Sequence, residues 1–177
     1  EMLFEGGEHA AAADLLDSAL NGQTLIVFAP RSYPGQRIEL APAGAVADVV
    51  VAMVEGNLLA VPVAAGAARQ VQNLGSLPLA DIMVTDDATL LAEGPQAARL
   101  HSEALDVWLT LTAAALVGGA GKAVQIGVQY AKERHAFGTP IGAFQAVQHQ
   151  CADMLLLLES ARSATYYAAW ALSEGTA

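Results

Sequence analysis

Cysteine and positive charge are both scarce in this sequence of 177 residues. Its single cysteine, Cys151, excludes an intrachain disulfide framework and a metal site built from several cysteines. Eight Lys and Arg stand against 18 Asp and Glu, which gives a formal net charge of −10. Because binding to a phosphate backbone needs a basic surface, this balance argues against a nucleic-acid partner.

Charged residues of both signs make up only 15% of the chain and hydrophobic residues 54%, a composition that excludes intrinsic disorder. The most apolar uncharged run, residues 107–121, is shorter than the roughly 20 residues of a spanning helix, so we expect no membrane insertion. The N-terminus has no basic region of the kind that opens a signal peptide. With the single cysteine, this favours a cytoplasmic protein.

The composition changes near Arg99. Before it, short β-branched runs bounded by Gly, Pro or Asn predict strands at 24–29, 37–41, 48–54, 58–63 and 79–84. The turn Glu55-Gly56-Asn57 between two apolar runs predicts a hairpin. Strands this short and closely spaced favour a small antiparallel sheet or barrel over βαβ units.

Helical patterns lie on both sides of the strands. A first helix is predicted over 9–20, closed by Asn21-Gly22, and two long ones over 96–134 and 143–173. In the last helix a single buried stripe is predicted, formed by Phe144, Val147, Cys151, Met154, Leu158, Ala161 and Thr165. Two helices this apolar cannot cover each other completely, so we expect further helices from the rest of a chain or from another subunit.

General motifs for chemistry are weak. Gly118-Gly119-Ala120-Gly121-Lys122 lacks the spacing and the Ser or Thr of a phosphate-binding loop, so we interpret it as small residues that let helices approach closely. The four histidines show no metal-ligand spacing. We therefore predict no metal site and expect most of the histidines to be solvated or hydrogen-bonded structural residues.

One stretch is highly specific. Residues 129–149 contain the pattern Tyr-Ala-x-x-Arg-x-x-Phe-Gly-x-Pro-Ile-x-x-Phe-Gln, beginning at Tyr130 and ending at Gln145. This pattern resembles the acyl-CoA dehydrogenase family, in its C-terminal helical domain. The resemblance implies an α+β fold with the end of an N-terminal helical domain at 1–22, a β-domain at 23–95 and an incomplete C-terminal helical domain at 96–177.

The resemblance also implies a cofactor site. Members of the family bind FAD across a dimer interface, and the arginine of the motif, here Arg134, approaches the flavin pyrophosphate held mainly by the other subunit. Phe137 matches an aromatic residue that packs near the nucleotide, and Gln145 matches an amide that hydrogen-bonds it. A guanidinium suits this role because it is permanently charged and can hold two phosphate oxygens at once.

Other parts of the family's active site are not recognisable. The Thr-Glu…Gly-Ser-Asp loop of the β-domain has no counterpart in residues 27–36. Where some members carry the catalytic glutamate and its neighbouring arginine, this chain has Trp108 and Leu109. Asp106 lies two residues away, about 200° round the helix, and Glu103 is further still, so no catalytic residue is assigned.

Three hypotheses follow. The first is a flavoprotein subunit that acts in α,β-dehydrogenation of an acyl-CoA thioester with FAD and depends on a second acyl-CoA dehydrogenase-like subunit, as in some bacterial enzymes of steroid side-chain breakdown. The second is an excerpt of a longer active chain, and the third a non-catalytic oligomerisation scaffold. The resemblance also implies electron-transfer flavoprotein as the electron acceptor, while the acyl group and the choice between homomer and heteromer stay open.

Overall fold

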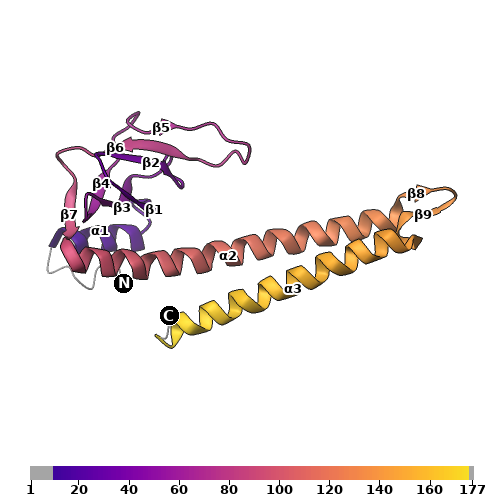
Figure 1. The fold of residues 1–177 in the computed structure, drawn as a ribbon. Helices are drawn as coiled ribbons and strands as arrows, with labels where there is room; N and C mark the ends of the chain where they lie inside the picture. Colours follow the sequence, from indigo (N-terminus) through magenta and orange to yellow (C-terminus); the bar gives the residue numbers. More distant parts are fainter. Residues whose placement is uncertain (1–9, 176–177) are drawn as a thin grey trace. The chain divides into compact units, whose positions relative to one another are not determined.

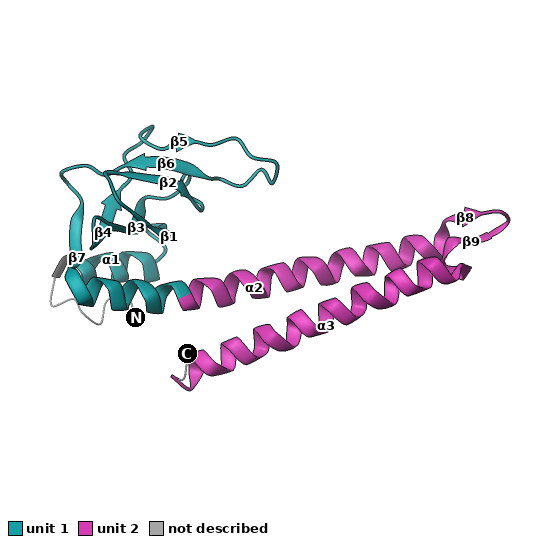
Figure 2. Ribbon diagram, viewed as in Figure 1, with its two compact units in different colours: residues 1–105 teal, residues 106–177 magenta. Residues whose placement is uncertain are grey.

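The computed structural model describes residues 10–175 and divides into two compact units at Leu105/Asp106 (Figure 2). The first predicted helix is present as α1 (Ala10–Leu20), and its expected first residue, His9, lies outside the described residues, as does the N-terminal segment searched for a signal peptide. Gly22 has a φ of 70°, as the predicted helix end requires.

The strands of the first unit form two sheets (Figure 1). The four-stranded sheet has the order β1-β3-β4-β7 and the three-stranded sheet the order β2-β6-β5. The bounds are β1 (Ile26–Tyr33), β2 (Arg37–Ala41), β3 (Val49–Val54), β4 (Asn57–Pro62), β5 (Arg69–Gln70), β6 (Ala80–Met83) and β7 (Thr89–Ala92). All five predicted strands are present within a few residues, and the short β5 and β7 were not predicted.

The expectation of purely antiparallel pairing is wrong in one place. β1 pairs with β3 in parallel, whereas every other described pair is antiparallel. The reason is topological, because the intervening β2 pairs with β6 in the other sheet and lets the chain return to run beside β1 in the same direction.

β3 lies at the centre of the first unit. All six residues of Val49–Val54 are buried, because one face of the strand contributes to the core between the two sheets and the other to the core beneath α1 and the start of α2. A strand covered on both faces needs an unbroken apolar run instead of an alternating one. The predicted hairpin follows it, with Glu55 and Gly56 at φ 50° and 84°, as a two-residue type I′ turn requires.

In the three-stranded sheet, an ion pair lies next to a residue with a strained backbone, Leu40. Arg37 Nη2 lies 2.6 Å from Asp81 Oδ2, and the backbone N–H of Leu40 donates to Asp81 Oδ1 at 3.0 Å. These two hydrogen bonds lower the pKa of Asp81 and hold Leu40 at a φ of 55° within β2. The carboxylate thus compensates for a left-handed conformation that a leucine rarely adopts.

The second unit is a pair of helices joined by a short hairpin. α2 (Gly94–Glu133) begins in the first unit, and it is followed by β8 (His135–Ala136), β9 (Thr139–Pro140), a 3₁₀ turn (Ile141–Ala143) and α3 (Gln145–Ser173). The predicted ends of both helices agree with these bounds within two residues.

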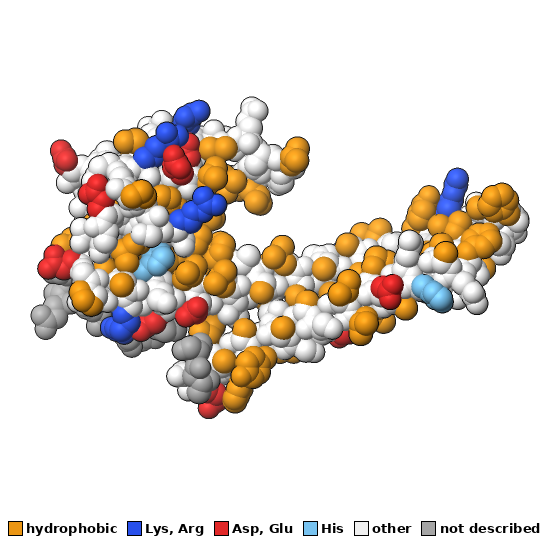
Figure 3. Space-filling view, in the orientation of Figure 1, with side chains coloured by type: hydrophobic (Ala, Val, Ile, Leu, Met, Phe, Trp, Pro, Cys, Tyr) orange, Lys and Arg blue, Asp and Glu red, His pale blue; other side chains and the backbone are white. Residues whose placement is uncertain are grey.

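The predicted stripe on α3 is buried only in part. Of its seven members, Leu158 is buried. Val147, Cys151 and Thr165 are half-buried, and Phe144, Met154 and Ala161 are exposed. The run Met154–Leu158 distributes apolar side chains all round α3, because successive residues turn about 100° about a helix axis. One neighbouring helix covers one side only, so apolar side chains remain uncovered along both helices (Figure 3).

Among the described helices, α2 is long and apolar enough to cross a membrane by length and composition. Its most apolar 18-residue window has a mean hydropathy of 1.4, and 6% of that window is buried. The length of the uncharged run 107–121 therefore does not exclude a membrane-spanning helix, because the run is part of a longer helix with few charges. A core helix of a soluble bundle passes the same test.

We expect Gly44→Ala to destabilise the protein by about 1–3 kcal/mol, because overpacking of a filled site forces its neighbours apart. A Cβ at Gly44 would lie 2.9 Å from Ala41 Cβ and 3.1 Å from Ile82 Cδ1. Gly35→Ala is the matched control, since a Cβ there meets nothing within 4 Å. Urea unfolding midpoints of the two variants test this, and equal midpoints would contradict the packing argument.

Candidate functional site

Arg134 lies in the turn between α2 and α3, where its backbone is held on both sides. Its N–H donates to Tyr130 O at 2.8 Å, and its carbonyl accepts from the N–H of Ile141 at 2.7 Å. Its side chain is exposed and makes no ion pair or hydrogen bond to any described residue. A permanently charged guanidinium on a fixed backbone is therefore available to an anion.

Phe137 forms the tip of the hairpin between β8 and β9. Phe137 and Gly138 have φ values of 53° and 81°, so the two-residue loop has the left-handed pair of a type I′ turn. The Phe137 side chain is 97% exposed and meets the ring of Phe144 edge-on, with centroids 6.4 Å apart. The predicted left-handed glycine is present, but Phe137 adopts the same conformation, which is costly for an aromatic residue.

Gln145 is the first residue of α3. The preceding Phe144 is extended and makes no side-chain capping hydrogen bond, and the first turn contains no acidic residue. The N-terminus of α3 therefore presents uncapped backbone N–H groups, which favour negative charge. The turn brings Arg134, Phe137 and Gln145 to the same end of the helix pair, as the sequence motif predicts.

A close backbone contact sets the geometry of this turn. A Cβ at Gly142 would lie 3.0 Å from the carbonyl oxygen of Ala131 and 3.3 Å from its carbonyl carbon. The carbonyl of Gly142 also accepts from Gln148 Nε2 at 2.9 Å. Glycine at this position thus lets the 3₁₀ turn lie directly on the last turns of α2.

The positions considered for a catalytic base hold no free glutamate. Trp108 is half-buried and Leu109 is 50% exposed. The carboxylate of Glu103 is paired with Arg99 Nη1 at 2.7 Å, one helical turn away.

His101 is a half-buried histidine near the start of α2. Its Nε2 is buried and has no hydrogen-bond partner among the described residues, and its ring lies 5.3 Å from that of Phe28. Burial lowers the pKa of His101, and the backbone of Arg31 and Ala29 opposes this effect only in part. No sequence signal distinguishes this histidine from the exposed His135 and His149, because its burial depends on β1.

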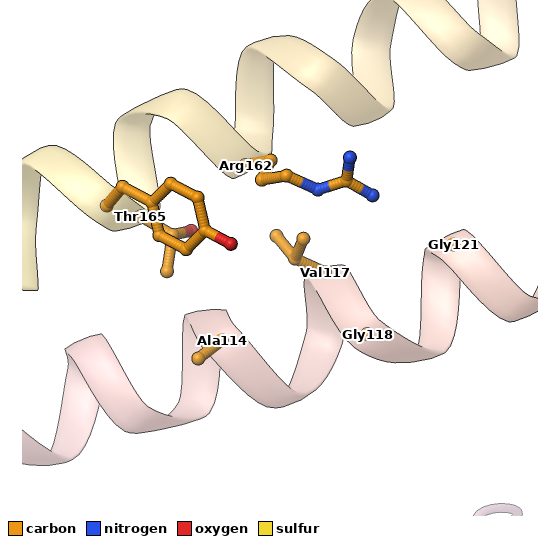
Figure 4. A pocket seen from close by; sticks show the side chains of 7 residues that line it. Ala114, Val117, Gly118, Gly121, Arg162 and Thr165 are labelled. Atoms are coloured by element: carbon orange, nitrogen blue, oxygen red, sulfur yellow. The ribbon is translucent and has the colours of Figure 1, made fainter.

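Small residues of α2 face α3 across a groove of about 240 Å³ (Figure 4). Arg162 of α3 extends over this groove and pairs with Glu159 at 2.6 Å. A Cβ at Gly121 would make ordinary contact with Leu158, and one at Gly118 would meet nothing within 4 Å. Close packing against α3 therefore does not by itself require these glycines.

The sequence profile of the acyl-CoA dehydrogenase C-terminal domain matches residues 98–177. The acyl-CoA dehydrogenase FadE34 of Mycobacterium tuberculosis is 40% identical over 104 residues, which are 57% of this chain and 14% of that protein. Residues 98–177 are therefore identified as an acyl-CoA dehydrogenase C-terminal domain.

Solved structures extend the likeness, at the level of the fold, to the β-domain. An acyl-CoA dehydrogenase from Geobacillus kaustophilus has a TM-score of 0.82 at 19% identity, over 99% of this chain and 57% of that one. A structure described as the Tcur3481-Tcur3483 steroid ACAD G363A variant has a TM-score of 0.73 at 26% identity, over 98% and 54%. The chain thus spans little more than half of these solved chains.

We expect Phe137→Asn to stabilise the folded chain by about 1 kcal/mol, because asparagine tolerates the left-handed conformation that phenylalanine does not. Phe137→Val should instead destabilise the chain, since a β-branched residue is still less compatible with a φ of 53°. Denaturant unfolding midpoints rank the three chains. A valine variant as stable as the asparagine variant would show that the turn is not strained.

Proposed function

We propose that this chain is a subunit of an FAD-dependent acyl-CoA dehydrogenase and contributes cofactor contacts from the turn between α2 and α3. The observation that carries the proposal is the exposed Arg134, unpaired within residues 10–175, beside the uncapped N-terminus of α3. In a chain of net charge −10, this is a local site at which a phosphate group is favoured over the surrounding surface.

The residues of the turn fit FAD. The family is FAD-dependent, and solved structures of the same fold are described as complexes with FAD and with FADH2. Arg134 would pair with the oxygens of the pyrophosphate, Gln145 would hydrogen-bond the nucleotide through its amide, and Phe137 would pack against it. When bound, FAD supplies the acceptor for the hydride that leaves the β-carbon of an acyl-CoA thioester.

Dependence on a partner is the finer part of the proposal. The positions at which some family members carry the base that removes the α-proton hold Trp108 and Leu109, which cannot accept a proton, and the nearby Glu103 is paired with Arg99. The apolar surface of α2 and α3 also needs other helices to cover it. The two-component description of the steroid ACAD structure supports a second acyl-CoA dehydrogenase-like subunit, in a homo- or hetero-oligomer.

Several further partners belong to the same proposal. An acyl-CoA is the substrate, and electron-transfer flavoprotein is the electron acceptor. We propose a cytoplasmic location with α2 covered by protein instead of lipid, because a family fold made of packed helices accounts for its apolar composition. The predicted domain boundaries at 22/23 and 95/96 are part of this interpretation.

Replacing Arg134 with Ala should weaken FAD binding about 10- to 100-fold, since a hydrogen bond to a charged group contributes roughly 1.5–3 kcal/mol. Arg134→Lys should keep part of the affinity, because lysine retains the charge but not the two-pronged geometry. The measurement is FAD titration of the apoprotein in its native assembly, followed by flavin fluorescence.

Lys122→Ala is the charge-matched control for this experiment. Lys122 lies on α2, twelve residues before Arg134, and its amine contacts Gln125 at 3.3 Å, away from the turn. The control should leave FAD affinity unchanged. If Arg134→Ala and Lys122→Ala bind FAD equally well, the turn does not contact the cofactor, and the scaffold hypothesis replaces this proposal.

Native mass spectrometry of the protein purified with the products of its neighbouring genes tests the partner directly. We expect a heteromer that carries fewer than one FAD per chain. A homomer with one FAD per chain would contradict partner dependence while leaving the cofactor contacts intact. A homomer without flavin would overturn both.

A further inference from the structure

The two groups of the turn that favour an anion lie on different elements. Arg134 directly follows α2, and the uncapped N-terminus of α3 begins at Gln145. The backbone N–H groups of Gln145 and Ala146 donate to no described residue, so both are available to a ligand. A ligand that contacts both elements binds more tightly when the position of α3 relative to α2 is fixed before it arrives.

Apolar packing contributes little to fixing that position at this end of the helix pair. A hollow of about 240 Å³ lies between the last turns of α2 and the first turns of α3, and it is lined by Val128, Ala131, Lys132, Gly142, Val147, Gln148 and Cys151. Of these residues, Ala131 alone is buried. The geometry of the turn therefore depends on backbone contacts and hydrogen bonds.

The side chain of Gln148 connects the two elements. It lies in the first turn of α3, where side chains lean towards the N-terminus of the helix, and its Nε2 donates to the carbonyl of Gly142 at 2.9 Å. Gly142 lies on the end of α2, since a Cβ there would be 3.0 Å from the carbonyl oxygen of Ala131. The neighbouring Ile141 donates its N–H to the carbonyl of Arg134 at 2.7 Å. Through Gly142, the Gln148 amide thus ties α3 to the segment that carries Arg134.

An amide suits position 148 better than a carboxylate of the same size. The amide donates to a carbonyl oxygen, so it leaves the free N–H groups at the start of α3 unoccupied. A glutamate there would accept from such N–H groups or repel a phosphate. Because the first turn of α3 contains no acidic residue, Gln148 orders the turn without adding negative charge.

We propose that Gln148 is a positioning residue of the cofactor-binding turn, which fixes the N-terminus of α3 relative to Arg134 through its hydrogen bond to Gly142 and does not itself contact FAD. This inference rests on the proposed function of the turn. Loss of the hydrogen bond should weaken FAD binding only while Arg134 is present, because the relative position of two contact groups no longer matters once one of them is removed.

The test is FAD titration of the apoprotein in its native assembly, followed by flavin fluorescence. Gln148→Met keeps the length of the side chain and removes the donor, and it should weaken FAD binding about 2- to 10-fold, the range expected for one neutral hydrogen bond. Because Gln148 is exposed, the substitution removes no core packing.

Gln150→Met is the matched control. The Gln150 side chain is exposed, lies about 200° round the helix from Gln148 and makes no hydrogen bond to a described residue. This variant should bind FAD as the wild type does. Equal FAD affinities of Gln148→Met and Gln150→Met would overturn the positioning role.

The double variant Arg134→Ala/Gln148→Met separates positioning from direct contact. It should bind FAD within about twofold of Arg134→Ala alone, whereas independent effects would add in full. Full additivity would show that Gln148 acts independently of Arg134, and the inference would then be wrong.

Hydrogen–deuterium exchange of the FAD-free assembly gives a readout that does not depend on the cofactor. Peptides that contain residues 141–146 should exchange faster in Gln148→Met than in the wild type, and Gln150→Met should match the wild type. Unchanged exchange in Gln148→Met contradicts the positioning role and leaves the contacts of Arg134 intact. Normal FAD affinity of Arg134→Ala would instead overturn the proposed function and the positioning role with it, so the two failures are distinguishable.

Discussion

The apolar side chains of α2 and α3 are only partly buried in the second unit. This incomplete burial means that the helix pair needs further protein to cover it. α3 has one buried residue, Leu158, although its sequence is apolar on every side around it. A helix pair in this condition is a part of a larger helical assembly, whichever polypeptide supplies the remaining helices.

The turn itself is ordered by local means. Backbone hydrogen bonds fix Arg134, the Gly142–Ala131 approach fixes the 3₁₀ turn, and the extended Phe144 begins α3. None of these contacts consumes the polar groups that face outward. The site can therefore keep its shape before a ligand or partner arrives, which lowers the entropic cost of binding.

Much of this structure could be predicted from sequence, and what was missed has physical causes. Helix ends and the Glu55-Gly56 hairpin depend on local chemistry, and the motif placed Arg134, Phe137 and Gln145 on one turn. The parallel β1–β3 pair depends on a crossover between two sheets, which no local pattern encodes. The burial of His101 and the left-handed Phe137 were missed because a histidine within a polar-apolar helix pattern and a phenylalanine before glycine both look ordinary.

The central position of β3 has a consequence for biosynthesis. Val49–Val54 is uncharged, contains no proline and is rich in β-branched residues, a composition that favours intermolecular cross-β pairing whenever such a segment is exposed. It is shielded by β1 on one edge, β4 on the other, and apolar layers on both faces. Part of that shield comes from the start of α2, some forty residues later in the chain. A nascent or truncated chain that ends before α2 therefore carries an uncovered aggregation-prone strand, and soluble production depends on this helix.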